Sequence, residues 1–189
     1  MGTFARSNNY RRAIVAAFVY RAALTPDEAH EIRRLRRRME RELARESHER
    51  INIKTGRGGL VDVEFLTQML QLTYGVHEPR VRVRSTFDAL QSLLDIGVLS
   101  ADDHALLSDG YRFLRRVENA LRLAHDRPVE DLDRGRMDLT AVAKRIGFDS
   151  GDGLWREYEV RREAIRACYE RWFDHAEAGL PPAGTAPLH

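Results

Sequence analysis

Apolar residues recur at helical spacing through nearly the whole chain, and this periodicity constrains the fold more than any other feature. Glycine, proline and capping residues divide the pattern into segments with short connections. The pattern predicts helices over residues 9–23, 26–46, 60–74, 85–97, 100–125, 138–146 and 152–176. Such segments favour an all-α fold, an antiparallel helical bundle of six to seven helices.

The clearest helix start lies at Thr25. Thr25 can cap the helix, Pro26 suits its first position, and Glu28 completes a capping box. The apolar residues of this helix form one narrow stripe: Ile32, Leu35, Met39 and Leu43. Because the stripe is narrow, we expect most of the seven arginines between residues 33 and 45 to face water in salt bridges.

Residues 50–54 alternate apolar and polar side chains and are the only strand-like stretch. A glycine-rich loop leads into the helix predicted over residues 60–74, which is apolar on more than one face and therefore central and buried. We expect three parts: N-terminal helices over 1–48 leading into the bundle, a helical bundle domain over 49–176, and a disordered tail over 177–189.

Composition excludes several classes of protein. Lys+Arg number 31 and Asp+Glu 29, so the formal net charge is only +2. One cysteine, Cys168, rules out a disulfide framework and paired-cysteine zinc sites, and we expect it to be a small buried residue. The seven histidines have no metal-binding spacing. The longest apolar run is far below the roughly 20 residues of a membrane span, and we expect a cytoplasmic protein without a membrane partner.

The segment from Ile53 to Gln68 carries the most chemistry. A loop with Lys54, Arg57 and three glycines precedes a helix start, where free backbone N–H groups form an anion site. The loop therefore predicts contact with a phosphate or nucleotide, although its spacing is not that of a Walker A motif. The alternative is that the glycines only turn the chain and Asp62 only stabilises the helix dipole.

Two carboxylates, Asp62 and Glu64, lie two residues apart in this segment. On a helix, residues at this spacing point about 200° apart, so the pair cannot chelate one ion. A two-metal catalytic centre needs carboxylates that converge. We therefore predict no self-contained catalytic centre here.

The whole run from Ile53 to Gln68, with Leu70-Gln71-Leu72 after it, closely resembles a hallmark of the glutamine synthetase adenylyltransferase family. The stretch Tyr111–Leu121 resembles a second signature, and Ala143–Phe148 a third, weaker one. The resemblance covers roughly residues 10–173. It implies the helical domain that follows a nucleotidyltransferase domain, in an enzyme that transfers AMP from ATP to a tyrosine of glutamine synthetase or removes it.

The family's nucleotidyltransferase signature is Gly-Ser or Gly-Gly followed about ten residues on by Asp-x-Asp, and we expect neither this signature nor its Asp-x-Asp carboxylates in the chain. The resemblance thus implies a C-terminal piece, a split subunit or a truncated reading frame that is inactive alone. We expect no catalytic residue, metal or cofactor in this chain, with Mg²⁺ and ATP bound by the nucleotidyltransferase domain. The implied partners are that domain, glutamine synthetase and the PII signalling protein.

Two residue sets are candidates for function. We expect one set to face the partner domain or nucleotide: Lys54, Arg57, Gly58, Gly59, Asp62, Glu64 and Gln68. A second set could line a basic groove or simply a solvated face: Arg112, Arg115, Arg116 and Arg122. Alternative functions are a stand-alone module that binds PII or an effector, and an arginine-rich nucleic-acid binder, which the nearly balanced charge disfavours.

Overall fold

The fold is described from a computed structural model, in residues 19–125, 130–135 and 139–180. Residues 9–18 of the first predicted helix, and the predicted tail beyond residue 180, lie outside this part of the chain. None of the helices in the described ranges is both long enough and apolar enough to cross a membrane.

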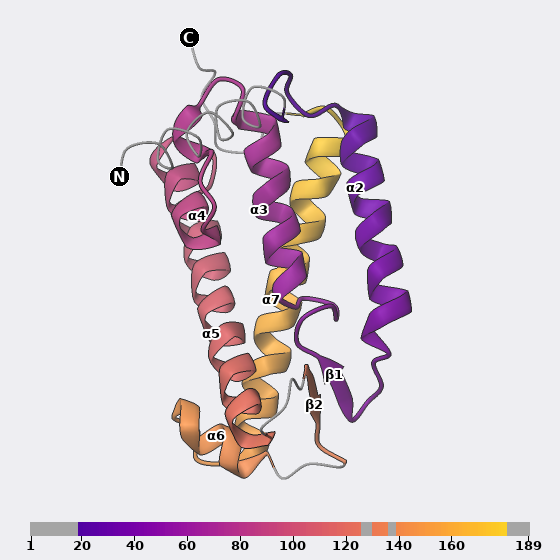
Figure 1. The fold of residues 1–189 in the computed structure, drawn as a ribbon, viewed down its shortest axis with the longest axis vertical. Coiled ribbons are helices and arrows are strands. Elements are labelled where there is room, and N and C mark those ends of the chain that lie inside the picture. The colour runs from indigo at the N-terminus through magenta and orange to yellow at the C-terminus, as the bar shows by residue number, and fades with distance from the viewer. Residues whose placement is uncertain (1–18, 126–129, 136–138, 181–189) are drawn as a thin grey trace, which may run out of the picture.

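Helices dominate the described residues, which confirms the predicted all-α fold (Figure 1). The α-helices are α2 (Pro26–Met39), α3 (Leu60–Tyr74), α4 (Thr86–Asp95), α5 (Ala101–His125), α6 (Thr140–Ile146) and α7 (Gly151–Glu177). The short elements are a π-helical turn η1 (Glu40–Ala44), a 3-10 turn η2 (Pro79–Val81), and strands β1 (Arg50–Asn52) and β2 (Asp131–Asp133). In Figure 1, α2 and α5 run downward, whereas α3 and α7 run upward between them.

The helix boundaries follow the capping signals in the sequence. Thr25 and Glu28 form the predicted capping box at the start of α2. Ser85 caps α4 by accepting a hydrogen bond from the backbone of Asp88. Gly147 ends α6 in the left-handed region, with φ 93°.

Helix α3 lies at the centre of the bundle, as predicted. It packs against α2, α4, α5 and α7. Apolar side chains are buried around most of its circumference: Leu60, Val61, Val63, Leu66, Met69 and Leu70. Helix α7 supplies the predicted aromatic face of this core, which is buried at Trp155, Tyr158, Ile165, Tyr169 and Trp172.

A two-stranded antiparallel sheet closes one end of the bundle. Strand β1 was predicted, but its partner β2 was not, because three residues are too few to establish a two-residue period. β2 also corrects an expectation, since Asp131-Leu132-Asp133 is an Asp-x-Asp triplet. Asp131 accepts hydrogen bonds from Arg50 (2.7 Å) and Asn52 (2.9 Å), which ties the two strands together. No Gly-Ser or Gly-Gly lies about ten residues before the triplet, so the full signature remains absent.

Five of the seven arginines between residues 33 and 45 are exposed, as predicted, but the inward face of α2 is not the apolar stripe. Leu35 and Leu43 of the apolar stripe are exposed, whereas Arg33 and Arg36 are buried. The arginines turn inward because the neighbouring helices α3 and α7 present carboxylates to them. On the outer side Arg34 pairs with Glu31 and Arg38 with Glu42, as expected for a solvated face.

Candidate functional site

The side chain of Asn52, at the end of β1, organises the glycine-rich loop. Its Oδ1 accepts hydrogen bonds from the backbone N–H groups of Lys54 (3.1 Å) and Thr55 (2.7 Å) and from the Thr55 hydroxyl (3.0 Å). Its Nδ2 donates to Asp131 of β2. Sequence reasoning missed Asn52, although an asparagine immediately before a turn is a known signal for this geometry.

The backbone donors of the loop are already used within it. The N–H of Gly58 donates to the Asp62 carboxylate at 2.7 Å, and the N–H groups of residues 59–62 donate to carbonyl oxygens of residues 53–59. The predicted anion site at the start of α3 required free N–H groups. The structure therefore corrects that prediction: a phosphate would find no unused donors among residues 58–62.

Gly58 allows a close approach, but the approaching group is this protein's own α7. Its φ is 67°, in the left-handed region. A Cβ atom on Gly58 would overlap the backbone carbonyl of Arg162. The glycine therefore serves the contact between the loop and α7, and both Gly58 and Gly59 are buried.

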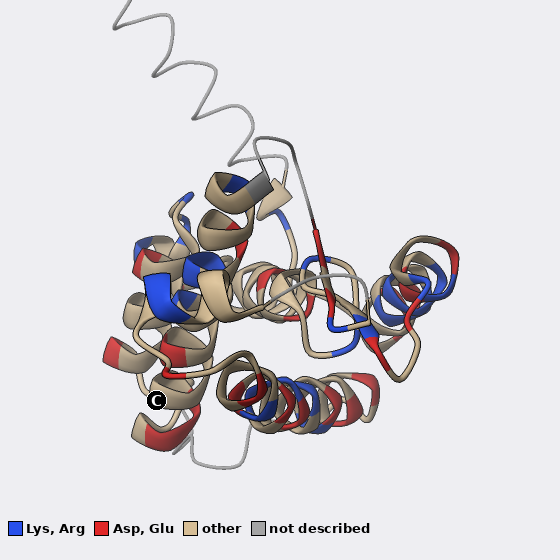
Figure 2. Ribbon diagram, turned by 90° about the horizontal axis from the view of Figure 1, so that it is seen from below, with Lys and Arg blue, Asp and Glu red and all other residues tan. Residues whose placement is uncertain are grey.

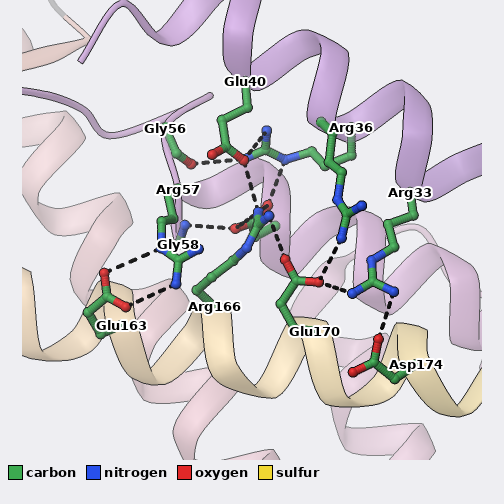
Figure 3. A network of polar contacts seen from close by, with 12 residues as sticks. Arg33, Arg36, Glu40, Gly56, Arg57, Gly58, Glu163, Arg166, Glu170 and Asp174 are labelled. Atoms are coloured by element: carbon green, nitrogen blue, oxygen red, sulfur yellow. Dashed lines mark hydrogen bonds and ion pairs between the residues drawn. The ribbon is translucent and has the colours of Figure 1, made fainter.

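Asp62 is fully buried beneath the loop, at the junction of α2, α3 and α7. Figure 3 shows the arginines and carboxylates of α2 and α7 that form the network at this junction. Its carboxylate lies 2.6 Å from Nε of Arg36 and 3.2 Å from Nη1 of Arg166. Arg36 also donates a hydrogen bond of 2.8 Å to the carbonyl oxygen of Gly56. Asp62 thus joins three helices and the loop, which is more than the predicted stabilisation of a helix dipole.

Further ion pairs extend this network along α2 and α7. Glu170 binds Arg33 and lies 2.6 Å from Arg166. Arg33 also binds Asp174 at 2.7 Å. Burial alone would lower the pKa of Arg166, but the carboxylates around it, Asp62 first among them, raise that pKa above its ordinary value. Arg166 therefore remains charged inside the bundle.

Lys54 and Arg57 carry the positive charge of the loop to the surface. Lys54 pairs with Glu130 at 3.1 Å, and Arg57 pairs with Glu163 of α7 at 3.2 Å. The hydrogen bond from Arg57 lowers the pKa of Glu163. Both pairs are exposed, so each contributes little to stability.

Glu64 points toward α5 and Asp62 toward α2 and α7, so the two carboxylates diverge as their helical spacing predicts. It accepts hydrogen bonds from the hydroxyl of Tyr111 (2.9 Å) and from Arg115 (3.0 Å). Arg115 also bonds Glu118 at 2.8 Å and lies over the Tyr111 ring. We call Glu64, Tyr111, Arg115 and Glu118 the α3–α5 cluster. It joins the two segments that resemble family signatures.

The predicted basic groove is divided among separate contacts. Arg112 pairs with Asp109 at 2.6 Å, Arg116 donates to the carbonyl oxygen of Ile146 at 2.7 Å, and Arg122 is exposed. Glu118 pairs with Arg115 at 2.8 Å. Of the partner-facing set, the remaining residue, Gln68, lies exposed on α3.

Cys168 is buried on α7, and burial raises the pKa of its thiol to about 12. Because the thiolate is the reactive form, we expect the folded protein to react with a thiol reagent such as DTNB at least about a hundredfold more slowly than a free thiol. Labelling rates with and without denaturant measure this difference. Rapid labelling of the folded protein would contradict the buried, inert thiol.

No group of three or more His, Cys, Asp or Glu side chains that could hold a metal ion occurs within the described ranges. Asp131 of the Asp-x-Asp triplet accepts hydrogen bonds from Arg50 and Asn52.

Comparison with known proteins links the chain to nucleotide-transferring enzymes. Residues 16–173 match a family described as GlnD PII-uridylyltransferase. The chain is 37% identical over 172 residues to a bifunctional glutamine synthetase adenylyltransferase/adenylyl-removing enzyme of Nocardia farcinica, covering 87% of this chain and 17% of that enzyme. The enzyme of the same name from Xanthomonas axonopodis pv. citri is 34% identical over 151 residues, covering 79% of this chain and 16% of that enzyme.

A third enzyme of that name, from Ralstonia nicotianae, is 31% identical over 134 residues, which cover 71% of this chain and 14% of that enzyme. The chain thus spans only 14–17% of the length of these relatives. The matched part includes the glycine-rich loop, the buried network and the α3–α5 cluster.

Proposed function

Because this chain belongs to the glutamine synthetase adenylyltransferase family, we propose that it is a helical accessory domain of such an enzyme. In this role it docks on a nucleotidyltransferase domain, in the same or a separate polypeptide. That domain binds ATP and Mg²⁺ and transfers AMP to, or removes it from, a tyrosine of glutamine synthetase. The chain orients the partner domain or its substrate and carries out no transfer alone.

The observation that carries the proposal is the α3–α5 cluster. Glu64 comes from the first segment that resembles the family, and Tyr111 and Arg115 come from the second. The two segments are 47 residues apart at the Tyr111–Glu64 contact, yet their polar groups meet on one side of the bundle. Arg115 and Glu64 are partly exposed, so the cluster can present a guanidinium and carboxylates to a partner.

Lys54 and Arg57 have a second role in the proposal. The buried network fixes the loop, and the loop holds the two cations near the surface in pairs that a ligand can replace. A nucleotide held by the partner domain carries phosphates that would compete with Glu130 and Glu163 for these cations. Lys54, Arg57, Glu64 and Gln68 are the members of the predicted set whose side chains reach the surface.

The names of the relatives favour adenylyl transfer over uridylyl transfer as the reaction of the complete enzyme. The matching family is described by its uridylyltransferase activity, but the curated relatives at 31–37% identity bear the adenylyltransferase name. We therefore propose ATP rather than UTP as the nucleotide and glutamine synthetase rather than PII as the acceptor protein.

A transfer assay tests the proposal. The chain is incubated with α-labelled ATP, Mg²⁺ and glutamine synthetase, alone and with a separately expressed nucleotidyltransferase domain of the Nocardia farcinica relative. We expect label on glutamine synthetase to increase only when both polypeptides are present. Label with the chain alone would show catalysis in this chain, no effect of the chain would refute the accessory role, and label from UTP on PII would reassign the substrates.

In the same assay we expect Arg57→Ala to lower transfer about tenfold, because one charge-assisted contact to a phosphate is lost. The free energy of unfolding should change by less than about 1 kcal/mol, since the Arg57–Glu163 pair is exposed. Arg80→Ala is the matched control because Arg80 also forms an exposed ion pair, with Glu78 at 3.1 Å. Equal transfer by both variants would remove Arg57 from the proposed site.

A further inference from the structure

The apolar stripe identified in the sequence runs along α2 into the turn η1, and two of its four residues, Leu35 and Leu43, are exposed. Leu35 is 53% and Leu43 55% exposed, although both are large apolar residues. The inward face of α2 is used by Ala29, Arg33 and Arg36 instead. Full burial of a leucine side chain is worth about 1.5–3 kcal/mol, so two exposed leucines on one helix face leave a considerable stabilisation unused.

The surface around the stripe is hollowed. A hollow of about 340 Å³ lies on the outer face of α2, where Ile32 and Leu35 meet the side chains of Arg34, Arg38 and Arg41. A larger hollow of about 680 Å³ lies at the start of α2 and is lined largely by apolar groups, including those of Leu24, Ile32 and Leu72. Glu31 and Ile32 line both hollows, so the two hollows lie next to one another on α2.

The margin of this surface is positively charged. The acidic residues of α2 lie in its first half and its arginines in its second half, where Arg34 pairs with Glu31 and Arg38 with Glu42 of the following turn. Figure 2 shows that both signs of charge occur on the helices of the bundle. Arg41 and Arg45, near the end of α2, form no ion pair with any residue in the described ranges. An apolar strip with unpaired arginines at one end fits a partner surface that has apolar side chains flanked by carboxylates.

We propose that this α2 strip, defined by Ile32, Leu35, Met39 and Leu43, is the surface on which the nucleotidyltransferase domain docks. The inference rests on the proposed function and adds the location of the interface and the chemistry of the partner surface. The relatives carry this helical domain within chains about six times its length, so other domains lie beside it in those enzymes. A second copy of this chain is the competing occupant.

The experiment compares aspartate substitutions at exposed apolar positions. The full chain carrying Leu35→Asp or Leu43→Asp is titrated by calorimetry into the separately expressed nucleotidyltransferase domain of the Nocardia farcinica relative. Val160→Asp is the matched control, because Val160 is 68% exposed on α7. We expect each α2 variant to bind at least about tenfold more weakly than the parent, as for an interface hot spot, and the control to bind equally well.

The outcomes separate this inference from the proposed function. If the parent chain binds and the α2 variants bind equally well, the α2 strip is not the interface, whereas the accessory role stands. If the parent does not bind at all, the proposed function and the inference both fail. If light scattering shows a dimer of the parent that Leu35→Asp dissociates, the strip belongs to a second copy and the proposal is overturned. Circular dichroism confirms that each variant is folded.

Discussion

Replacing Asp62 with alanine is expected to lower the free energy of unfolding by about 3–5 kcal/mol. The side chain is fully buried, and its carboxylate is the shared partner of Arg36 and Arg166. Both guanidinium groups are also buried, so the substitution leaves two charges with fewer compensating contacts. Urea unfolding followed by circular dichroism measures the change.

Glu31→Ala serves as the control for this experiment. Glu31 also pairs with an arginine of α2, Arg34 at 2.7 Å, but both side chains are exposed. Its removal should change stability by no more than about 1 kcal/mol. If Asp62→Ala and Glu31→Ala have similar effects, Asp62 does not hold the three helices together, and a functional role for its carboxylate would regain support.

Gly58→Ala is expected to destabilise the fold by about 2–5 kcal/mol. A left-handed backbone costs a residue with a Cβ about 1–2 kcal/mol, and Gly58 has φ 67°. The new methyl group would in addition overlap the backbone of Arg162, and overpacking of this kind costs typically about 1–3 kcal/mol. The same urea denaturation experiment measures the total change in the free energy of unfolding.

Gly97→Ala separates the two contributions. Gly97 has φ 74°, but a Cβ there would meet no atom within 4 Å. We therefore expect Gly97→Ala to cost only the backbone contribution of about 1–2 kcal/mol. The loss of stability by Gly58→Ala beyond that by Gly97→Ala measures the cost of the steric overlap between the loop and α7. Equal effects at the two positions would mean that α7 moves to accommodate the methyl group.

Asp62 and Gly58 change the interpretation of the segment from Ile53 to Gln68. The sequence indicates a ligand site from its glycines and charges, but much of the segment builds the bundle. Asp62 and Gly58 connect α3 to α7, and Asn52 fixes the loop that precedes them. The charges of Lys54 and Arg57 remain at the surface, and the functional proposal depends on them.

Local signals determined most of the secondary structure. The capping box at Thr25, the cap at Ser85 and the stop at Gly147 act within a few residues, so the sequence contains all the information needed to place them. The central position of α3 also followed from sequence, because a helix that is apolar on several faces has no side suited to water.

The direction in which α2 faces was decided by the tertiary structure alone. The 3.6-residue period identified the apolar stripe but could not show that Asp62 and Glu170 would lie opposite Arg33 and Arg36. Those carboxylates are 26 residues or more away in sequence, and a buried guanidinium is stable only where such partners converge. The pairing of Glu64 with Tyr111 and Arg115 has the same origin. Periodicity and capping thus fixed where the helices are, whereas the contacts between distant charges fixed which face each helix buries and which it leaves for a partner.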